Sequence, residues 1–78
     1  MKHVLDALQM KTKTEAHPYL KEVLGLPEYY GGNLDALYDC LSEREDIEVE
    51  IRNMPEGKTY VSKIVNVMKD ADVKVEIQ

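Results

Sequence analysis

The spacing of apolar and polar residues changes several times along this 78-residue chain, and each change marks an expected element. Residues His3 to Leu5 fit a short opening strand. A helix to about Leu24 is predicted next, with Thr14 as its N-cap and Pro18 in its first turn, where a missing N–H is tolerated. Its apolar residues share one face: Ala16, Leu20, Val23 and Leu24.

The second predicted helix is the most regular segment. Gly25 and Pro27 end the helix before it, and the loop that follows contains Gly31 and Gly32, which permit backbone angles or close approaches that a side chain would block. Asn33 is a good N-cap. An apolar stripe with Tyr38 at its edge then follows the helical period: Leu34, Leu37 and Leu41. Acidic residues share a neighbouring face: Asp35, Asp39 and Glu43.

The remaining chain reads as strand, helix and strand. Ile47, Val49 and Ile51 alternate with Glu48, Glu50 and Arg52, the pattern of a strand with one buried face and one wet face. Residues 53–57 form a turn, and Thr59 is expected to cap a helix to about Asp70. This helix has a broad apolar face: Tyr60, Val61, Ile64, Val65, Val67 and Met68. In a closing strand, Val73, Val75 and Ile77 alternate with Lys74 and Glu76.

The order of these elements predicts the fold class. Helical crossovers between strands favour a parallel sheet with right-handed connections. The alternation in the second and third strands indicates that helices cover mainly one face, since a sheet covered on both faces would have continuous apolar runs. We therefore predict one α/β domain over residues 1–78, with a three-stranded parallel sheet and three main helices packed mostly on one face. A domain of this size has a modest core and thin stability.

Charge is concentrated in one segment. The formal net charge is -5, but residues 28–50 hold eight acids and a single base, Arg44, which leaves the rest of the chain at +2. This balance argues against nucleic acid as a direct ligand, because affinity for a polyanion comes mainly from lysine and arginine at phosphates. A basic protein fits better as the partner.

Composition limits the compartment and the chemistry. The single cysteine, Cys40, cannot form an internal disulfide and no charged-then-apolar leader begins the chain, so we expect a cytoplasmic protein. No apolar run approaches the roughly 18 residues of a membrane span. Neither His3 nor His17 shows a local link to Cys40. We interpret Cys40 as a semi-buried filler and both histidines as ordinary surface or strand-edge residues, and we expect no enzymatic activity and no cofactor.

The acidic face of the second helix has a structural explanation only in part. Asp35 in the first turn interacts favourably with the helix dipole. Asp39 lies in mid-helix, where aspartate is a poor helix former and a like charge four residues away costs roughly 0.2 to 0.5 kcal/mol. A solvated face on an acidic protein stays open as an explanation. Aromatic and apolar residues flank the carboxylates, however, and this mixture is typical of an interface centre: Tyr29, Tyr30, Leu34 and Tyr38.

From Leu26 to Leu41, the run LPEYYGGNLDALYDCL resembles the barstar family, intracellular protein inhibitors of extracellular ribonucleases of the barnase type. Coarser similarity extends over almost the whole chain. The resemblance implies a parallel three-stranded sheet with flanking helices. It also implies a monomer that forms a 1:1 complex with a basic extracellular ribonuclease and plugs its active site.

The resemblance also implies roles for individual residues. The family's aspartate at the position of Asp39 enters the site that binds substrate phosphate, and Asp35 is similar to a second anchoring carboxylate. Further positions match the family's interface: Tyr29, Gly31, Asn33, Leu34 and Tyr38. Secondary partner-binding positions are Gly32, Ser42 and Glu43. The physical reasoning agrees, because carboxylates on a rigid helix can stand where RNA phosphates would lie, and opposed charges speed the encounter.

The chain also departs from the family. The segment between the second strand and the last helix is shorter, and the family's acidic interface residue on the last helix has no clear match near Asn66 and Val67. Arg44 stands where barstar has an aromatic ring, and we expect it at the interface rim, where it is unhelpful against a basic enzyme.

Two alternative functions stay open. The first is a barstar-like immunity or regulatory module for another basic toxin protein. The second is an acidic domain that binds a divalent metal through Asp35, Asp39 and Glu43, although calcium needs about six to eight oxygens, usually from a loop.

Overall fold

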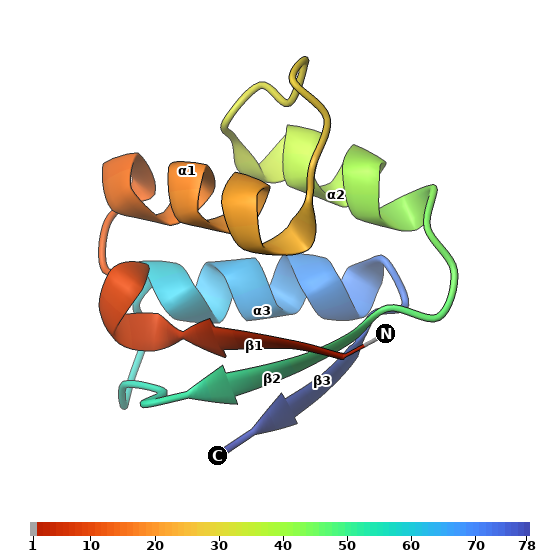
Figure 1. The fold of residues 1–78 in the computed structure, drawn as a ribbon. Helices are drawn as coiled ribbons and strands as arrows, with labels where there is room; N and C mark the ends of the chain where they lie inside the picture. The colour runs from red at the N-terminus through yellow and green to blue at the C-terminus, as the bar shows by residue number, and fades with distance from the viewer. Residues whose placement is uncertain (1) are drawn as a thin grey trace.

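The computed structural model describes residues 2–78 and contains the predicted order of strands and helices (Figure 1). The elements are β1 (Lys2–Asp6), a 3-10 helix η1 (Ala7–Gln9), α1 (Lys13–Leu24), α2 (Leu34–Ser42), β2 (Glu48–Arg52), α3 (Tyr60–Asp70) and β3 (Lys74–Ile77). Only η1 was not predicted, because a single turn is too short to show a period. None of the helices within residues 2–78 has the length and apolarity that crossing a bilayer requires.

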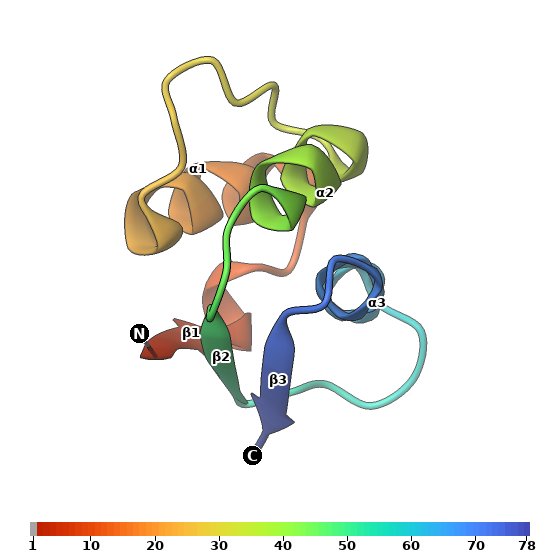
Figure 2. The same cartoon turned by 90° about the vertical axis from the view of Figure 1, so that its right-hand side faces the viewer.

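The sheet confirms the predicted fold class. Its strands lie in the order β1-β2-β3 and all pair in parallel. The register places Val49 beside His3 and Val75, and Ile51 beside Leu5 and Ile77. All three α-helices lie on one side of the sheet (Figure 2). Within residues 2–78, the other face of the sheet carries no helix.

The helices occupy different places over this face. α1 packs against β1, α3 packs against β3, and the most extensive contacts of α2 are with α3. One core joins the sheet to all three helices, and its largest fully buried members include Leu5, Leu20, Leu37, Leu41, Ile51, Ile64 and Met68. Because α2 rests mainly on another helix, it stands apart from the sheet (Figure 2), and its outer face is left to solvent.

Most predicted helix ends are confirmed, but the start of α1 is not. Gly25 ends α1 in a left-handed conformation with φ 63°. Thr59 caps α3 through a reciprocal pair of hydrogen bonds with Ser62. The prediction of Thr14 as the cap of α1 is wrong, because Thr12 accepts the N–H of Glu15 and the helix begins two residues earlier. Pro18 therefore lies beyond the first turn, where it lacks the N–H that would donate to the carbonyl of Thr14, an exposed residue.

On the face of the sheet without helices, the prediction that Glu50 is exposed to water is wrong. The wet face predicted for β2 includes this residue, yet Glu50 is only 5% exposed, since it lies on the central strand between two neighbours. Its carboxylate lies 2.7 Å from Nε of Arg52 and 3.3 Å from Nζ of Lys2, and it accepts a hydrogen bond from Gln78. The hydrogen bond from Arg52, followed by that from Lys2, holds the pKa of Glu50 below its ordinary value. Ion pairs on this face thus compensate its charge.

Candidate partner-binding surface

The loop between α1 and α2 follows from its glycines and its cap. Leu26 is buried, and its N–H donates to the carbonyl of Lys21, which fixes the start of the loop. Gly32 has a left-handed φ of 70°, which a side chain would disfavour, whereas Gly31 shows no such need. Asn33 then caps α2 as predicted, its Oδ1 accepting the N–H of Ala36 at 2.8 Å. The loop is therefore held at both of its ends, and this fixes the direction in which α2 begins.

The predicted site residues lie together around this junction. We call them the α2 surface: Tyr29, Gly31, Asn33, Leu34, Asp35, Tyr38 and Asp39. All except the half-buried Leu34 are exposed. The secondary positions adjoin this surface, with Gly32 half-buried and Ser42 and Glu43 exposed. The hydroxyl of Ser42 donates to the carbonyl of Asp39 at the end of α2.

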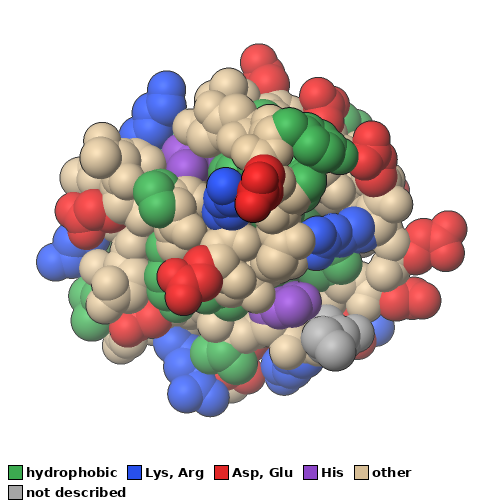
Figure 3. All heavy atoms as spheres, turned by 45° about the horizontal axis from the view of Figure 1, so that its top comes forward, with side chains coloured by type: hydrophobic (Ala, Val, Ile, Leu, Met, Phe, Trp, Pro, Cys, Tyr) green, Lys and Arg blue, Asp and Glu red, His purple; other side chains and the backbone are tan. Residues whose placement is uncertain are grey.

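The two central carboxylates project from neighbouring turns of α2. Asp35 and Asp39 are four residues apart on one helix, so their side chains share a face, and both are exposed. Within residues 2–78 neither has an ion-pair partner, in contrast to Glu48, Glu50 and Glu76 of the sheet. Figure 3 shows acidic side chains along the upper right of the molecule, beside exposed hydrophobic surface.

Aromatic rings flank these carboxylates at the surface. Tyr29 is 79% exposed and Tyr38 is 42% exposed, as predicted, and both are large rings to leave in water. The inner face of α2 anchors the arrangement through Leu37, Cys40 and Leu41, which are buried. Burial raises the pKa of the Cys40 thiol, which agrees with its interpretation as a filler. The α2 surface therefore combines rings and carboxylates on an anchored helix.

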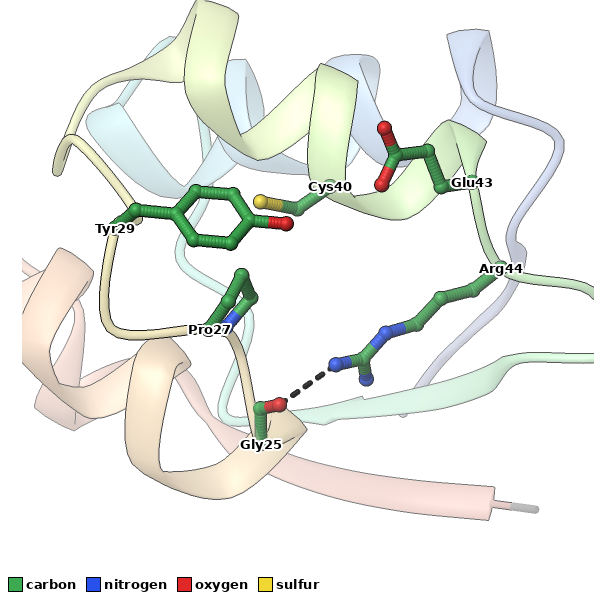
Figure 4. Close-up of a pocket in the computed structure, with 6 residues that line it drawn as sticks. All are labelled: Gly25, Pro27, Tyr29, Cys40, Glu43 and Arg44. Carbon is green, nitrogen blue, oxygen red and sulfur yellow. Dashed lines mark hydrogen bonds between the residues drawn. The ribbon is translucent and has the colours of Figure 1, made fainter.

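A pocket of about 280 Å³ adjoins Tyr29 (Figure 4). Pro27 and Tyr29 border one side, Glu43 and Arg44 the other, and the thiol of Cys40 points toward the Tyr29 ring. Arg44 does not act as a free rim charge. Its guanidinium donates to the carbonyls of Leu24 at 2.5 Å and Gly25 at 2.6 Å. Arg44 thus joins the end of α2 to the end of α1, a role that the sequence interpretation did not include, and its place at the interface rim stays a prediction.

The sequence interpretation also missed a buried polar cluster behind the loop. His17 was expected at the surface, yet it is buried in α1, with Tyr30 on Nδ1 and Tyr60 on Nε2. Tyr60 was correctly expected in packing. Tyr19 also packs against the core, and its hydroxyl accepts the N–H of Asp6. A signal for His17 was present, because residues 17, 20 and 24 fall on one helical stripe.

The metal-binding alternative finds no geometric support. Across residues 2–78, no three side chains of His, Cys, Asp or Glu converge closely enough to hold an ion. Asp35 and Asp39 come from regular helix rather than from a loop, so the backbone between them supplies no further oxygens.

Comparison with known proteins covers almost the whole chain. The family model described as Barstar (barnase inhibitor) matches residues 1–77. The chain is also 30% identical over 81 residues to "Putative ribonuclease inhibitor YrdF" of Bacillus subtilis (strain 168), and this alignment covers 96% of the chain and 89% of that relative. The similarity thus extends well beyond the α2 surface.

Proposed function

Because this chain belongs to the barstar family, we propose that it is a protein inhibitor of a barnase-type ribonuclease rather than an enzyme. The observation that carries the proposal is the pair Asp35 and Asp39, exposed on one face of α2 without ion-pair partners in the described chain and flanked by Tyr29 and Tyr38. A ribonuclease concentrates cations to hold a phosphodiester. Carboxylates entering that site replace the phosphates as acceptors of charge-assisted hydrogen bonds.

The rigidity of α2 favours this use. Binding costs free energy for every group that becomes ordered on docking. Here the helix is capped by Asn33 and held from beneath by Leu37 and Leu41, both fully buried. The carboxylates are therefore already positioned before the partner arrives. The exposed rings of Tyr29 and Tyr38 would supply the apolar contact area that surrounds an interface centre.

The charge distribution favours a basic partner. Residues 28–50 carry a charge of -7 against +2 elsewhere. The negative charge is therefore concentrated in one segment of the chain, and its field attracts a cationic enzyme. A buried carboxylate needs a paired cation, because removing it from water without one costs several kcal/mol. The partner we propose is accordingly a basic extracellular ribonuclease, bound 1:1 by a cytoplasmic inhibitor that protects the producing cell before export.

An inhibition assay tests the proposal. RNA cleavage by a barnase-type ribonuclease is followed while the purified chain is titrated in, at low and at high salt. We expect a 1:1 endpoint and slower association at high salt. Asp39→Ala should weaken inhibition by at least about 30-fold, which corresponds to the roughly 2 kcal/mol of an interface hot spot. Its thermal midpoint should equal or exceed that of the wild type, since alanine is the better helix former and repulsion is relieved.

Glu56→Ala is the matched control. It removes the same charge from an exposed position in the segment between β2 and α3, at the end of the molecule away from α2 (Figure 1), and should leave inhibition nearly unchanged. Equal effects of the two substitutions would show that only net charge matters. A loss of stability together with inhibition would mark Asp39 as structural. Unchanged cleavage at saturating protein would reject the ribonuclease and favour another basic toxin.

A further inference from the structure

His17 lies where three segments of the chain meet. It is a residue of α1, it is 3% exposed, and its two ring nitrogens contact tyrosine hydroxyls from two other segments. Nδ1 contacts Oη of Tyr30, in the loop before α2, and Nε2 lies 2.6 Å from Oη of Tyr60, at the start of α3. The Tyr60 ring meets the imidazole edge-on at an interplanar angle of 78°.

The loop that touches His17 is the one that carries part of the α2 surface. Tyr30 stands between Tyr29 and Gly31, so its hydroxyl is the polar anchor of that stretch. Gly32 approaches the same histidine, since a Cβ placed on Gly32 would lie 3.9 Å from the Cβ of His17. His17 thus contacts the loop through Tyr30 and lies near it at Gly32, and its contact with Tyr60 connects the loop to α3.

The hydrogen-bond chemistry of this cluster depends on the charge of the ring. A neutral imidazole has one donor and one acceptor nitrogen, so one tyrosine donates to it and the other accepts from it. A protonated ring has two donors, and the tyrosine that donated must turn its proton elsewhere. The groups facing His17 and its partners are Lys13 and Lys21 of α1, Tyr30, Tyr60 and, beyond Tyr30, Cys40 of α2. None of these neutralises a buried cation.

We propose that His17 is the positioning residue of the α2 surface: the neutral ring holds Tyr30, and with it Tyr29 and Gly31, in the binding geometry, and protonation of the ring releases this loop. The effect on a partner rests on the proposed function. The response of the loop itself does not, because it belongs to the free protein.

The direction of the pH dependence follows from the surroundings. Burial, and then the charge of Lys13, lower the pKa of His17 below its ordinary value of 6.5. The neutral ring is therefore favoured in the folded protein. Its contribution is complete above about pH 6.5 and is lost as the pH falls through the lower folded pKa. If only the neutral form binds, affinity falls about tenfold for each pH unit below that pKa.

Nuclear magnetic resonance on the intact free protein tests the loop. Imidazole nitrogen shifts and backbone amide shifts are recorded from about pH 7.5 to 5, the range in which histidine titrates. We expect the amides of Gly31 and Gly32 to move with the same midpoint as the His17 ring. In His17→Gln these movements should vanish. The proposal would be overturned if the chemical shifts of the loop amides did not change with the His17 titration, or if they changed equally in His17→Gln.

Tyr60→Phe provides a second variant that keeps the ring and its packing. It removes only the hydroxyl contact to Nε2, and we expect the His17 midpoint to shift while the loop continues to follow it. This variant and the wild type decide the question even if His17→Gln does not fold. Loop amides whose titration midpoint differs from that of the His17 ring in Tyr60→Phe would count against the proposal.

A binding measurement separates this proposal from the function it rests on. The dissociation constant for a barnase-type ribonuclease is compared between wild type and His17→Gln at neutral and acidic pH, because titration of the enzyme is common to both and cancels. Wild type should lose more affinity on acidification. A responsive loop without any ribonuclease binding would reject the function alone. Binding with equal pH dependence in both proteins would reject the role of His17.

Discussion

Removing the guanidinium of Arg44 tests how the two ends of the binding loop are held. Its two hydrogen bonds reach the carbonyls of Leu24, the last residue of α1, and of Gly25, its C-cap, at the helix end where carbonyls lack helical partners. Hydrogen bonds from a charged donor contribute about 1.5 to 3 kcal/mol each when buried. Arg44 is only half-buried and one of the two bonds is exposed, so solvent screening reduces the pair to about 2 to 3 kcal/mol.

Urea unfolding followed by circular dichroism measures this contribution. Arg44→Ala should lower the unfolding free energy by about 2 to 3 kcal/mol, and the thermal midpoint by roughly 10 to 20 °C for a domain of this size. Arg44→Lys is the matched control for charge. Its ammonium keeps the positive charge but lacks the planar fork that donates to two carbonyls at once, so it should recover at most about half of the loss.

The same substitution separates two expectations for binding. If Arg44 were only a rim cation, its removal would speed association with a basic enzyme and tighten the complex, by less than about 1 kcal/mol. The contacts of Arg44 predict that Arg44→Ala associates faster but that its dissociation rate rises by a larger factor, so that binding weakens. The reason is that the loop that carries Tyr29 loses its support at Gly25. An Arg44→Ala protein within about 0.5 kcal/mol of wild-type stability that also binds more tightly would refute the structural role.

Two further predictions concern the fold beneath the surface. Leu37→Ala should cost about 2.7 to 5 kcal/mol in urea unfolding, because the side chain is fully buried, and a loss under about 1 kcal/mol would mean that α2 is loosely packed. Hydrogen bonds from Arg52 and Lys2 depress the pKa of Glu50, so its contribution to stability is present above the ordinary value of 4.5 and is lost as the pH falls through the lower folded pKa. Thermal midpoints measured from neutral to acidic pH should fall less steeply in Glu50→Gln than in the wild type, and identical slopes would contradict this assignment.

The fold was predictable because each element has its own period and its own end signal. Leu34, Leu37 and Leu41 define α2 by spacing, and Asn33 and Gly25 mark helix ends for local steric and hydrogen-bonding reasons. The cap of α1 was also readable, although it was misassigned. Thr12 precedes Glu15 by three residues, which is the capping-box spacing, and the hydroxyl of Thr12 donates to the Glu15 carboxylate.

The contacts that position the site were harder to predict. Arg44 bonds to backbone carbonyls of α1, and their position depends on how two helices pack, which no local pattern encodes. Glu50 alternates correctly with its apolar neighbours, yet it is buried because strands pair on both of its sides. His17 follows the apolar stripe of α1, but its partners Tyr30 and Tyr60 are 13 and 43 residues away. The spacing of apolar residues therefore does not predict contacts between side chains of distant segments.

The cations of the described chain that form ion pairs lie away from the carboxylates of the α2 surface. Lys2, Arg52 and Lys74 pair with acids of the sheet, and Arg44 serves the end of α1. Asp35 and Asp39 receive none of these charges, and their mutual repulsion costs the free protein a few tenths of a kcal/mol. A cationic partner would remove that cost on binding. The barnase-type ribonuclease that we propose should therefore raise the thermal midpoint of the chain in proportion to the logarithm of its concentration above the dissociation constant, and Asp39→Ala should lose most of this shift while remaining at least as stable alone.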